Sequence, residues 1–340
     1  MPKTSSQKLN IVDAVRKRPG MYFGNPGGQA VNHAIYEVVA NSVDQYLCGA
    51  ATKVKLEIND HSIRVTDDGA GLPFDKEAPN KNYSNLVEYY LTNRHDLATA
   101  DNHAPHIHLI GGGLGLAVVN AVSEKVEIRS SNSSTTYRQI FSRGKIVSEA
   151  TLEKNSTQAG TSIEIILDKE IFADYGADKN QLRKTMFELA HFYPGLIVEY
   201  QQERFHTENG LLDLAYIHYN KTSFSETHTP TEFFYKGKHK EVQLQIAALG
   251  ESNKSSEYLS WVNGSSTLKG GTHITGLKDI FRLANWNPDI VLIHVIMHNP
   301  SFAGPTKDSL SSKEVIDAIE KLVREPVLTF RKTLIRTDQL

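Results

Sequence analysis

Apolar residues recur along this chain with two different periods. Recurrence every three to four positions predicts helices over residues 31–47, 85–91, 181–191 and 312–328, and a further helix through Val122 that follows the glycine run 111–115. Alternation, or a short continuous apolar run, predicts strands over residues 52–58, 63–67, 125–129, 135–141, 161–167, 242–247, 257–262 and 291–297. The chain therefore mixes helices with strands along its whole length.

Two stretches follow neither period. Residues 92–108 are polar and rich in histidine, which predicts a mobile loop. Residues 220–240 are polar and irregular, and we predict no helix or strand there. A chain of 340 residues exceeds the usual size of one domain, and a second unit is predicted to begin near residue 200.

Composition narrows the classes of function. The net charge of −2 and the pI near 6.7 exclude a strong overall positive field, so any contact with DNA must come from a local patch or from another polypeptide. The single cysteine, Cys48, excludes an intramolecular disulfide and fits a reducing compartment. Residues 1–10 are polar and carry no apolar signal core, and no apolar run is long enough to span a membrane. We therefore expect a cytoplasmic protein that does not contact a membrane.

The first predicted helix carries a candidate cation site. Glu37, Asn41 and Asp44 stand at positions i, i+4 and i+7, so they share one helix face. A carboxamide oxygen can ligate Mg²⁺ while a carboxylate one turn away orients a water. A solvated helix face carries the same residue types, and the pattern alone leaves both interpretations open.

A glycine-rich turn follows the second predicted strand, in the segment 67–73 (Asp-Asp-Gly-Ala-Gly-Leu-Pro). Gly69 and Gly71 permit a turn that brings the backbone close to a ligand. Asp67, at the end of the strand, could accept a hydrogen bond from an exocyclic amine such as that of adenine. An ordinary Asp-Gly turn is the alternative.

A second glycine run precedes a helix and consists of Gly111, Gly112, Gly113, Leu114 and Gly115. Bare backbone amides at a helix N-terminus form an anion site that suits phosphates, although such loops also occur for structural reasons. The run is not a Walker A loop, because no Lys-Ser or Lys-Thr pair follows it. It also lacks the leading strand of a dinucleotide fingerprint.

The order of these three elements resembles the Bergerat ATP site of the GHKL superfamily. More specifically, the chain resembles the ATPase and transducer region of type IIA DNA topoisomerase B subunits, those of gyrase and topoisomerase IV. The resemblance rests on five segments in the family's order, spread between about residue 11 and residue 330: 13–22 (DAVRKRPGMY), 37–44 (EVVANSVD), 160–161 (GT), 270–276 (GGTHITG) and 305–310 (PTKDSL).

This resemblance implies an α+β fold with two domains. Residues 1–200 would form a Bergerat (GHKL) ATP-binding α/β sandwich, and residues 201–340 a smaller βαβ transducer domain. The implied cofactors are ATP and Mg²⁺, and the implied activity is ATP hydrolysis that drives closure of a dimer.

The resemblance also implies roles for individual residues. Glu37 would be the general base that activates water, and Asn41 would hold Mg²⁺. Asp67 would accept from the adenine amino group, and Thr161 would support this contact through water. Gly71, Leu72 and Pro73 would line the base, residues 111–115 would wrap the phosphates, and Lys307 would reach the γ-phosphate.

The chain departs from the family pattern at three places. Ala70 replaces an arginine that the family's aminocoumarin inhibitors contact, and Gln45 replaces that arginine's acidic partner. The segment 101–110 lacks the usual lysines and tyrosine and instead carries His103, His106 and His108, whose spacing does not match a metal site. Pro305 replaces a glutamine that would grip the γ-phosphate, so hydrolysis and closure are more affected than binding.

The resemblance implies an ATP-dependent homodimer. No DNA-cleavage domain is recognisable before the chain ends at Leu340, so we expect a gyrase A-like cleavage protein as partner, with DNA reached through it. A slow or non-hydrolysing nucleotide-dependent module that regulates a topoisomerase is the alternative. A histidine-kinase catalytic domain is a third hypothesis, suggested by residues 113–119, but it explains neither the second domain nor Lys307.

Overall fold

The computed structural model describes residues 10–24, 27–60, 62–94, 107, 114–154, 158–173, 176–222, 229–251 and 255–337. Its contacts divide the chain into two compact units. The first holds residues 1–104, 110–182 and 199–203, and the second holds residues 105–109, 183–198 and 204–340.

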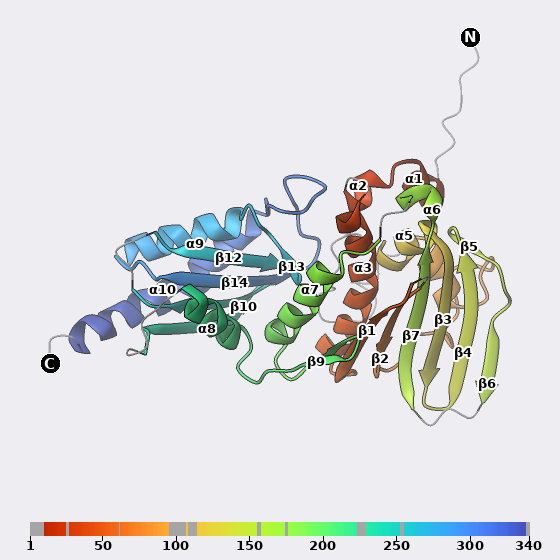
Figure 1. The fold of residues 1–340 in the computed structure, drawn as a ribbon, viewed down its shortest axis with the longest axis horizontal. Coiled ribbons are helices and arrows are strands. Elements are labelled where there is room, and N and C mark those ends of the chain that lie inside the picture. Colours follow the sequence, from red (N-terminus) through yellow and green to blue (C-terminus); the bar gives the residue numbers. More distant parts are fainter. Residues whose placement is uncertain are drawn as a thin grey trace, which may run out of the picture. The chain divides into compact units, whose positions relative to one another are not determined.

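A twisted sheet is the centre of the first unit (Figure 1). Within the described residues its strands run in the order β5-β4-β3-β7-β2-β1-β8-β9, and β6 also pairs with β4. The bounds are β1 Lys53–Ile58, β2 Ile63–Asp67, β3 Ser123–Asn132, β4 Thr135–Ser142, β5 Lys145–Ile146, β6 Thr151–Lys154, β7 Ala159–Leu167, β8 Ile197–Tyr200 and β9 Glu203–Phe205. The division between the units falls within β8 and β9, whose residues 199–203 belong to the first unit. β2 is antiparallel to both β1 and β7, and β7 is antiparallel to β3.

Helices cover one face of this sheet. They are α1 Ile11–Lys17, α2 Gly20–Phe23, α3 Gly28–Leu47, α4 Leu86–Thr92, α5 Gly115–Ala121 and α6 Lys169–Phe172. On β1, Val54, Leu56 and Ile58 are buried, whereas the residues between them are only half-buried. This period of two shows that a single face of the strand is fully covered. The unit is thus the two-layer α/β sandwich that the sequence predicted.

Arg16 anchors the first helix to the rest of the unit. Its guanidinium donates to the Ala121 carbonyl at the end of α5 (2.9 Å) and pairs with Asp168 (2.9 Å). The Asp168 carboxylate, only 1% exposed, also pairs with Arg143 and caps α6 by accepting from the Glu170 N–H. Arg16, within the segment 13–22, therefore holds α1 against α5, the helix that follows the glycine run.

A five-stranded sheet is the centre of the second unit, within the described part of the chain. Its order is β10-β11-β14-β12-β13, with β10 Glu232–His239, β11 Val242–Leu249, β12 Glu257–Val262, β13 Ser265–Ser266 and β14 Ile290–Met297. The helices are α7 Lys179–Phe192, α8 Leu211–Thr222, α9 Thr272–Leu283 and α10 Glu314–Thr337. β12 and β14 are parallel, and α9 lies between them in the chain. This is the predicted βαβ unit.

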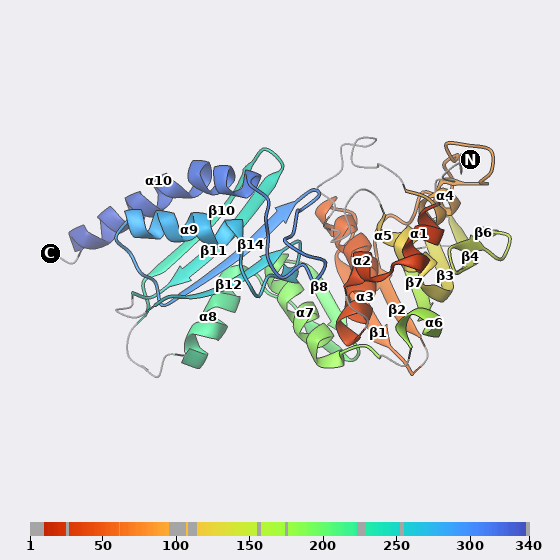
Figure 2. The ribbon, with the colours of Figure 1, turned by 90° about the horizontal axis from the view of Figure 1, so that it is seen from above.

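Both faces of the second sheet are covered. All eight residues of β14 are buried, as its continuous apolar run predicted. Figure 2 shows α9 and α10 on one face of the sheet and α8 on the other. The apolar side chains of α9 and α10 complete a core with the sheet residues, among them Leu277, Phe281, Val315, Ile319 and Val323.

The prediction that residues 220–240 contain no strand was wrong. β10 pairs with β11 in register from Glu232↔Leu249 to His239↔Val242. It is an edge strand on which only Phe233 is fully buried, so its sequence lacks the apolar alternation that identifies half-buried strands. Helices α8 and α9 were also not predicted. Helix α10, which contains Pro326, continues past the predicted end at residue 328 to Thr337.

No helix within the described residues is both long enough and apolar enough to span a membrane.

Glu188 is a buried carboxylate in the second unit. It lies on α7, is 2% exposed, and accepts from the Trp261 indole N–H at 3.0 Å. Lys184, one turn earlier, approaches it at only 3.7 Å. Burial raises the pKa of Glu188 to about 6, although Lys184 and Trp261 oppose the rise. Because its folded pKa lies above the unfolded value, the contribution of Glu188 to folding stability is most favourable below pH ~4.5 and is lost as pH rises through ~6.

Replacing this carboxylate should remove that pH dependence. Glu188→Gln keeps the shape and an acceptor for Trp261, so it should stabilise the protein at pH 8 by about 2 kcal/mol and make no difference below pH ~4.5. Denaturant unfolding followed by tryptophan fluorescence measures this, since both tryptophans, Trp261 and Trp286, lie in the second unit. Glu320→Gln, at a partly exposed position, is the control. Equal shifts in the two variants would contradict the assignment.

Candidate functional site

Three polar side chains form a row across the sheet of the first unit. Asp67 on β2 is paired with Thr161 on β7, and Thr161 is paired with Ser130 on β3. The two preceding rows on the same face are apolar: Val65, Ile163 and Ile128, then Ile63, Ile165 and Val126. The core of the sandwich thus ends in a polar row, which we call the Asp67–Thr161–Ser130 row.

Three donors hold the Asp67 carboxylate. The Ser42 hydroxyl donates to Oδ2 at 2.7 Å and the Gly69 N–H to Oδ1 at 3.0 Å, and the Thr161 N–H is the third donor. Burial raises the pKa of Asp67, and these three hydrogen bonds oppose the rise. A carboxylate has about four lone-pair positions, so one acceptor position is left for a ligand donor.

At three glycines near this strand end, the backbone packs closely against neighbouring segments. A Cβ at Gly69 would lie 2.9 Å from Gln45 Cβ, and one at Gly160 would lie 2.5 Å from the Asp67 carbonyl oxygen. Gly71 has φ +85°, and its Cβ would lie 2.4 Å from the Ser131 carbonyl oxygen. Each position therefore excludes a side chain, and at Gly71 the left-handed backbone excludes one independently of space.

Two side chains of helix α3 bind Asp67 and the glycine turn that follows it. Ser42 binds Asp67, and the Gln45 side-chain oxygen accepts from the Ala70 N–H at 3.2 Å. Every residue from 30 to 40 is buried, with Glu37 at 0% exposure, so the solvated-face interpretation of this helix is wrong.

The predicted base and cation ligand stand one turn apart on α3. The Asn41 NH₂ donates to the Glu37 carbonyl at 2.8 Å. This contact uses the donor side of the carboxamide, so its oxygen is the atom that can ligate a cation. The residue types therefore fit a Mg²⁺ held together with a polyphosphate. Asp44, one turn further along, is also buried.

Contacts with strands β3 and β4 hold the segment that follows the glycine turn. The Leu72 N–H donates to Ser130 Oγ at 2.7 Å, and Phe74 stacks on Tyr137 with ring centroids 5.3 Å apart. Leu72 and Pro73 stay partly exposed between these two anchors. They can present an apolar surface to a flat ring, as the resemblance implied.

Gly111, Gly112 and Gly113 lie outside the described residues, as do His103, His106 and His108. Leu114 occupies the N-cap position of α5, and Gly115 is the first residue of the helix. Asn120 fixes the helix, because its NH₂ donates to the Leu91 carbonyl (2.8 Å) and its side-chain oxygen accepts from the Gly144 N–H (3.3 Å).

Lys307 lies in the second unit, on a loop that two of the quoted segments build together. Gly271 and Leu310 form a β-bridge, and a Cβ at Gly271 would lie 2.2 Å from the Leu310 carbonyl oxygen. Lys269 pairs with Asp308 at 2.6 Å. Lys307 is 7% exposed with φ +59°, so the loop holds it in a defined backbone conformation.

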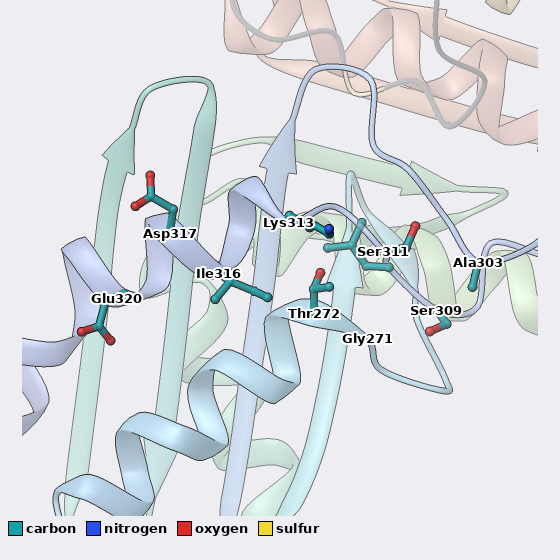
Figure 3. A pocket seen from close by; sticks show the side chains of 10 residues that line it. Gly271, Thr272, Ala303, Ser309, Ser311, Lys313, Ile316, Asp317 and Glu320 are labelled. Atoms are coloured by element: carbon teal, nitrogen blue, oxygen red, sulfur yellow. The ribbon is translucent and has the colours of Figure 1, made fainter.

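A groove of about 780 Å³ lies beside this loop (Figure 3). The N-terminal end of α9, the loop and the first turns of α10 form it. None of the predicted site residues lines it; the lining residues are Gly271, Thr272, Ala303, Ser309, Leu310, Ser311, Lys313, Ile316, Asp317 and Glu320.

Sequence reasoning missed two contacts of the site, those of Ser42 and Ser130. Both are serines at positions where an apolar residue is expected: Ser42 in the stripe of α3, and Ser130 after Val126 and Ile128 on β3. A single hydroxyl in an otherwise apolar stripe was the available signal, because a buried polar group needs a partner.

Comparison with known proteins finds ATPases of one kind. Residues 28–171 match the model of the histidine kinase-, DNA gyrase B- and HSP90-like ATPases. The chain is 30% identical to the DNA gyrase B protein of Thermotoga maritima, covering 96% of this chain and 56% of that protein. It is 32% identical to the chloroplastic/mitochondrial DNA gyrase B protein of Oryza sativa, covering 94% and 48%. The chain thus spans about half the length of these relatives.

Solved structures agree with this relation. The 43K ATPase domain of Thermus thermophilus gyrase B, solved with an aminocoumarin, matches with a TM-score of 0.75 and 25% identity over 96% of this chain and 92% of that one. The ATPase region of Saccharomyces cerevisiae topoisomerase II matches in fold, with a TM-score of 0.68 and 18% identity over 97% and 98%. Residues 28–171 of the chain therefore match the histidine kinase-, gyrase B- and HSP90-like ATPases, and nearly the whole chain is similar to the ATPase region of gyrase B proteins.

Proposed function

We propose that this chain binds ATP with Mg²⁺ and hydrolyses it, and that hydrolysis drives nucleotide-gated closure of a homodimer in a type II DNA topoisomerase. The observation that carries the proposal is the Asp67 carboxylate, which is buried at a strand end, held by three donors and left with one acceptor position. That position suits the adenine amino group.

Hydrolysis needs a water aimed at the γ-phosphate and neutralisation of the phosphate charge. Glu37, at 0% exposure, supplies the carboxylate that accepts the proton of the water. Asn41 offers its side-chain oxygen to Mg²⁺, whose bound charge offsets that of the phosphates. Two further roles are carried over from the resemblance alone: residues 111–115, of which 111–113 lie outside the described residues, would wrap the phosphates, and Lys307 would contribute a positive charge to turnover.

The partners of this function are also proposals. The gyrase B relation suggests an ATP-dependent homodimer and a gyrase A-like cleavage protein through which DNA is reached. The net charge of −2 agrees with DNA contacts that come mainly from the partner.

Turnover and binding should depend on different carboxylates. Glu37→Ala should still bind nucleotide but hydrolyse it at least ~100-fold more slowly, because the positioned base is lost. Asp67→Asn should instead lose affinity, since an amide cannot accept from all its donors. Steady-state ATPase rates and calorimetric affinities separate the two effects.

Two other carboxylates serve as controls. Glu149→Ala changes an exposed glutamate, and Asp68→Asn changes a carboxylate that binds Thr52 and the Lys53 N–H instead of facing the site. Both should retain nucleotide affinity and turnover. A parental chain that binds ATP without hydrolysing it would favour the regulatory module, and hydrolysis at the parental rate by Glu37→Ala would refute the role of Glu37.

Nucleotide should change the oligomeric state. A non-hydrolysable ATP analogue with Mg²⁺ should convert monomer to dimer, because a ligand that binds the closed dimer more tightly shifts the population toward it. Sedimentation velocity with and without the analogue measures this. Asp67→Asn, deprived of the adenine contact, should remain monomeric. A parental chain with the same mass under both conditions would disprove nucleotide gating.

Inhibitor binding should follow the departures at Ala70 and Gln45. Gln45 accepts from the Ala70 backbone N–H, and the exposed Ala70 side chain offers neither a stacking plane nor donors. Aminocoumarins should therefore bind weakly while ATP binds normally. Ala70→Arg with Gln45→Glu should strengthen drug binding by about 5- to 150-fold. Calorimetry on both proteins, with Gln45→Glu alone as control, decides this; tight drug binding by the parental chain would show that Ala70 is not the determinant.

A further inference from the structure

Ser130 is the member of the Asp67–Thr161–Ser130 row to which the proposed function gives no part in nucleotide recognition. Its side chain is 1% exposed. Ser130 Oγ accepts from the Leu72 N–H at 2.7 Å and lies 3.1 Å from Thr161 Oγ1. One hydroxyl therefore touches both the segment that lines the base and the residue beside Asp67.

The hydrogen-bonding capacity of the two hydroxyls limits what Thr161 can do. Each hydroxyl has one proton and two acceptor lone pairs. Ser130 Oγ already accepts from Leu72, and its own proton has Thr161 Oγ1 within reach. When Ser130 donates to Thr161, the Thr161 proton is directed away from Ser130, so Thr161 offers a donor to a ligand.

A donor next to an acceptor recognises one purine edge. Adenine carries a donor, its 6-amino group, next to an acceptor, its N1; guanine carries an acceptor, O6, next to a donor, its N1–H. Asp67 accepts, so a donor at Thr161 complements adenine and opposes guanine. A bridging water that accepts from Thr161 keeps its protons for the base, so the same direction holds through a water.

We propose that Ser130 is a positioning residue for base recognition: it fixes the Thr161 hydroxyl as a donor beside Asp67, and so makes the site select adenine over guanine nucleotides. This inference rests on the proposed ATP-binding function and names the residue that determines its base specificity. Ser130 acts through Thr161 and does not itself touch the base.

A purely structural role of Ser130 gives a different expectation. If the hydroxyl only anchors the Leu72 backbone, its loss loosens a wall that adenine and guanine share, and both nucleotides lose affinity equally. The ratio of the two affinities therefore separates the hypotheses, whereas the affinity for ATP alone does not.

The experiment measures the affinities of non-hydrolysable ATP and GTP analogues by calorimetry on the full chain. Ser130→Ala should lower the ratio of ATP to GTP affinity by about 5- to 30-fold, because the freed Thr161 hydroxyl can turn to accept from guanine. Ser123→Ala is the matched control on the same strand: it also removes a buried hydroxyl, which donates to the Val119 carbonyl at 2.7 Å outside the row. It should leave the ratio unchanged.

A double-mutant cycle tests the route through Thr161 and does not depend on one variant. Thr161→Val, nearly isosteric, should lower the ratio by a similar factor, and Ser130→Ala combined with Thr161→Val should lower it no further. An unchanged ratio in Ser130→Ala, or additive effects in the cycle, would overturn the inference while ATP binding stands. A parental chain that binds neither analogue would overturn the proposed function together with the inference.

Discussion

The buried carboxylate of Asp67 is the constraint on which the rest of the site depends. A charge at 8% exposure is costly unless donors surround it, so the chain must bring several donors to one strand end. They come from three separate segments: α3 through Ser42, the turn through Gly69, and β7 through Thr161. Their convergence explains why Gly69 and Gly160 have no room for a side chain.

Helix α3 links this contact to the proposed chemistry. Ser42 and Gln45 fasten the helix to Asp67 and the glycine turn. Asn41 directly precedes Ser42, and Glu37 stands about one turn nearer the N-terminus than Asn41. A regular helix rises about 1.5 Å per residue, so the distance from the base-binding end to the water-activating end is set by a rigid element. Its burial from residue 30 to residue 40 prevents it from shifting independently of the sheet.

The second unit uses the same device of close backbone approach. Gly271 lets the segment 270–276 bridge to Leu310, and the resulting loop carries Lys307 with a left-handed backbone. Two segments that are more than twenty residues apart in the chain therefore form one structural feature. Their joint presence in the sequence is explained by this contact, because neither segment could hold the loop alone.

The sequence by itself determined the elements with a strong period and the residues with a recognisable order. The helix 31–47, the strands 63–67 and 291–297, Asp67 with its glycines, and the likeness to gyrase B proteins could all be predicted from local pattern.

Tertiary structure decided the rest. Whether Ser130 meets Thr161, and whether Ser42 meets Asp67, depends on strand register and on the placement of α3 over the sheet. The strand β10 likewise exists because β11 pairs with it, although its own residues lack the alternation. Local pattern reports which side of an element is buried, whereas a hydrogen bond between distant segments requires that their backbones be brought into register, which only the folded chain does.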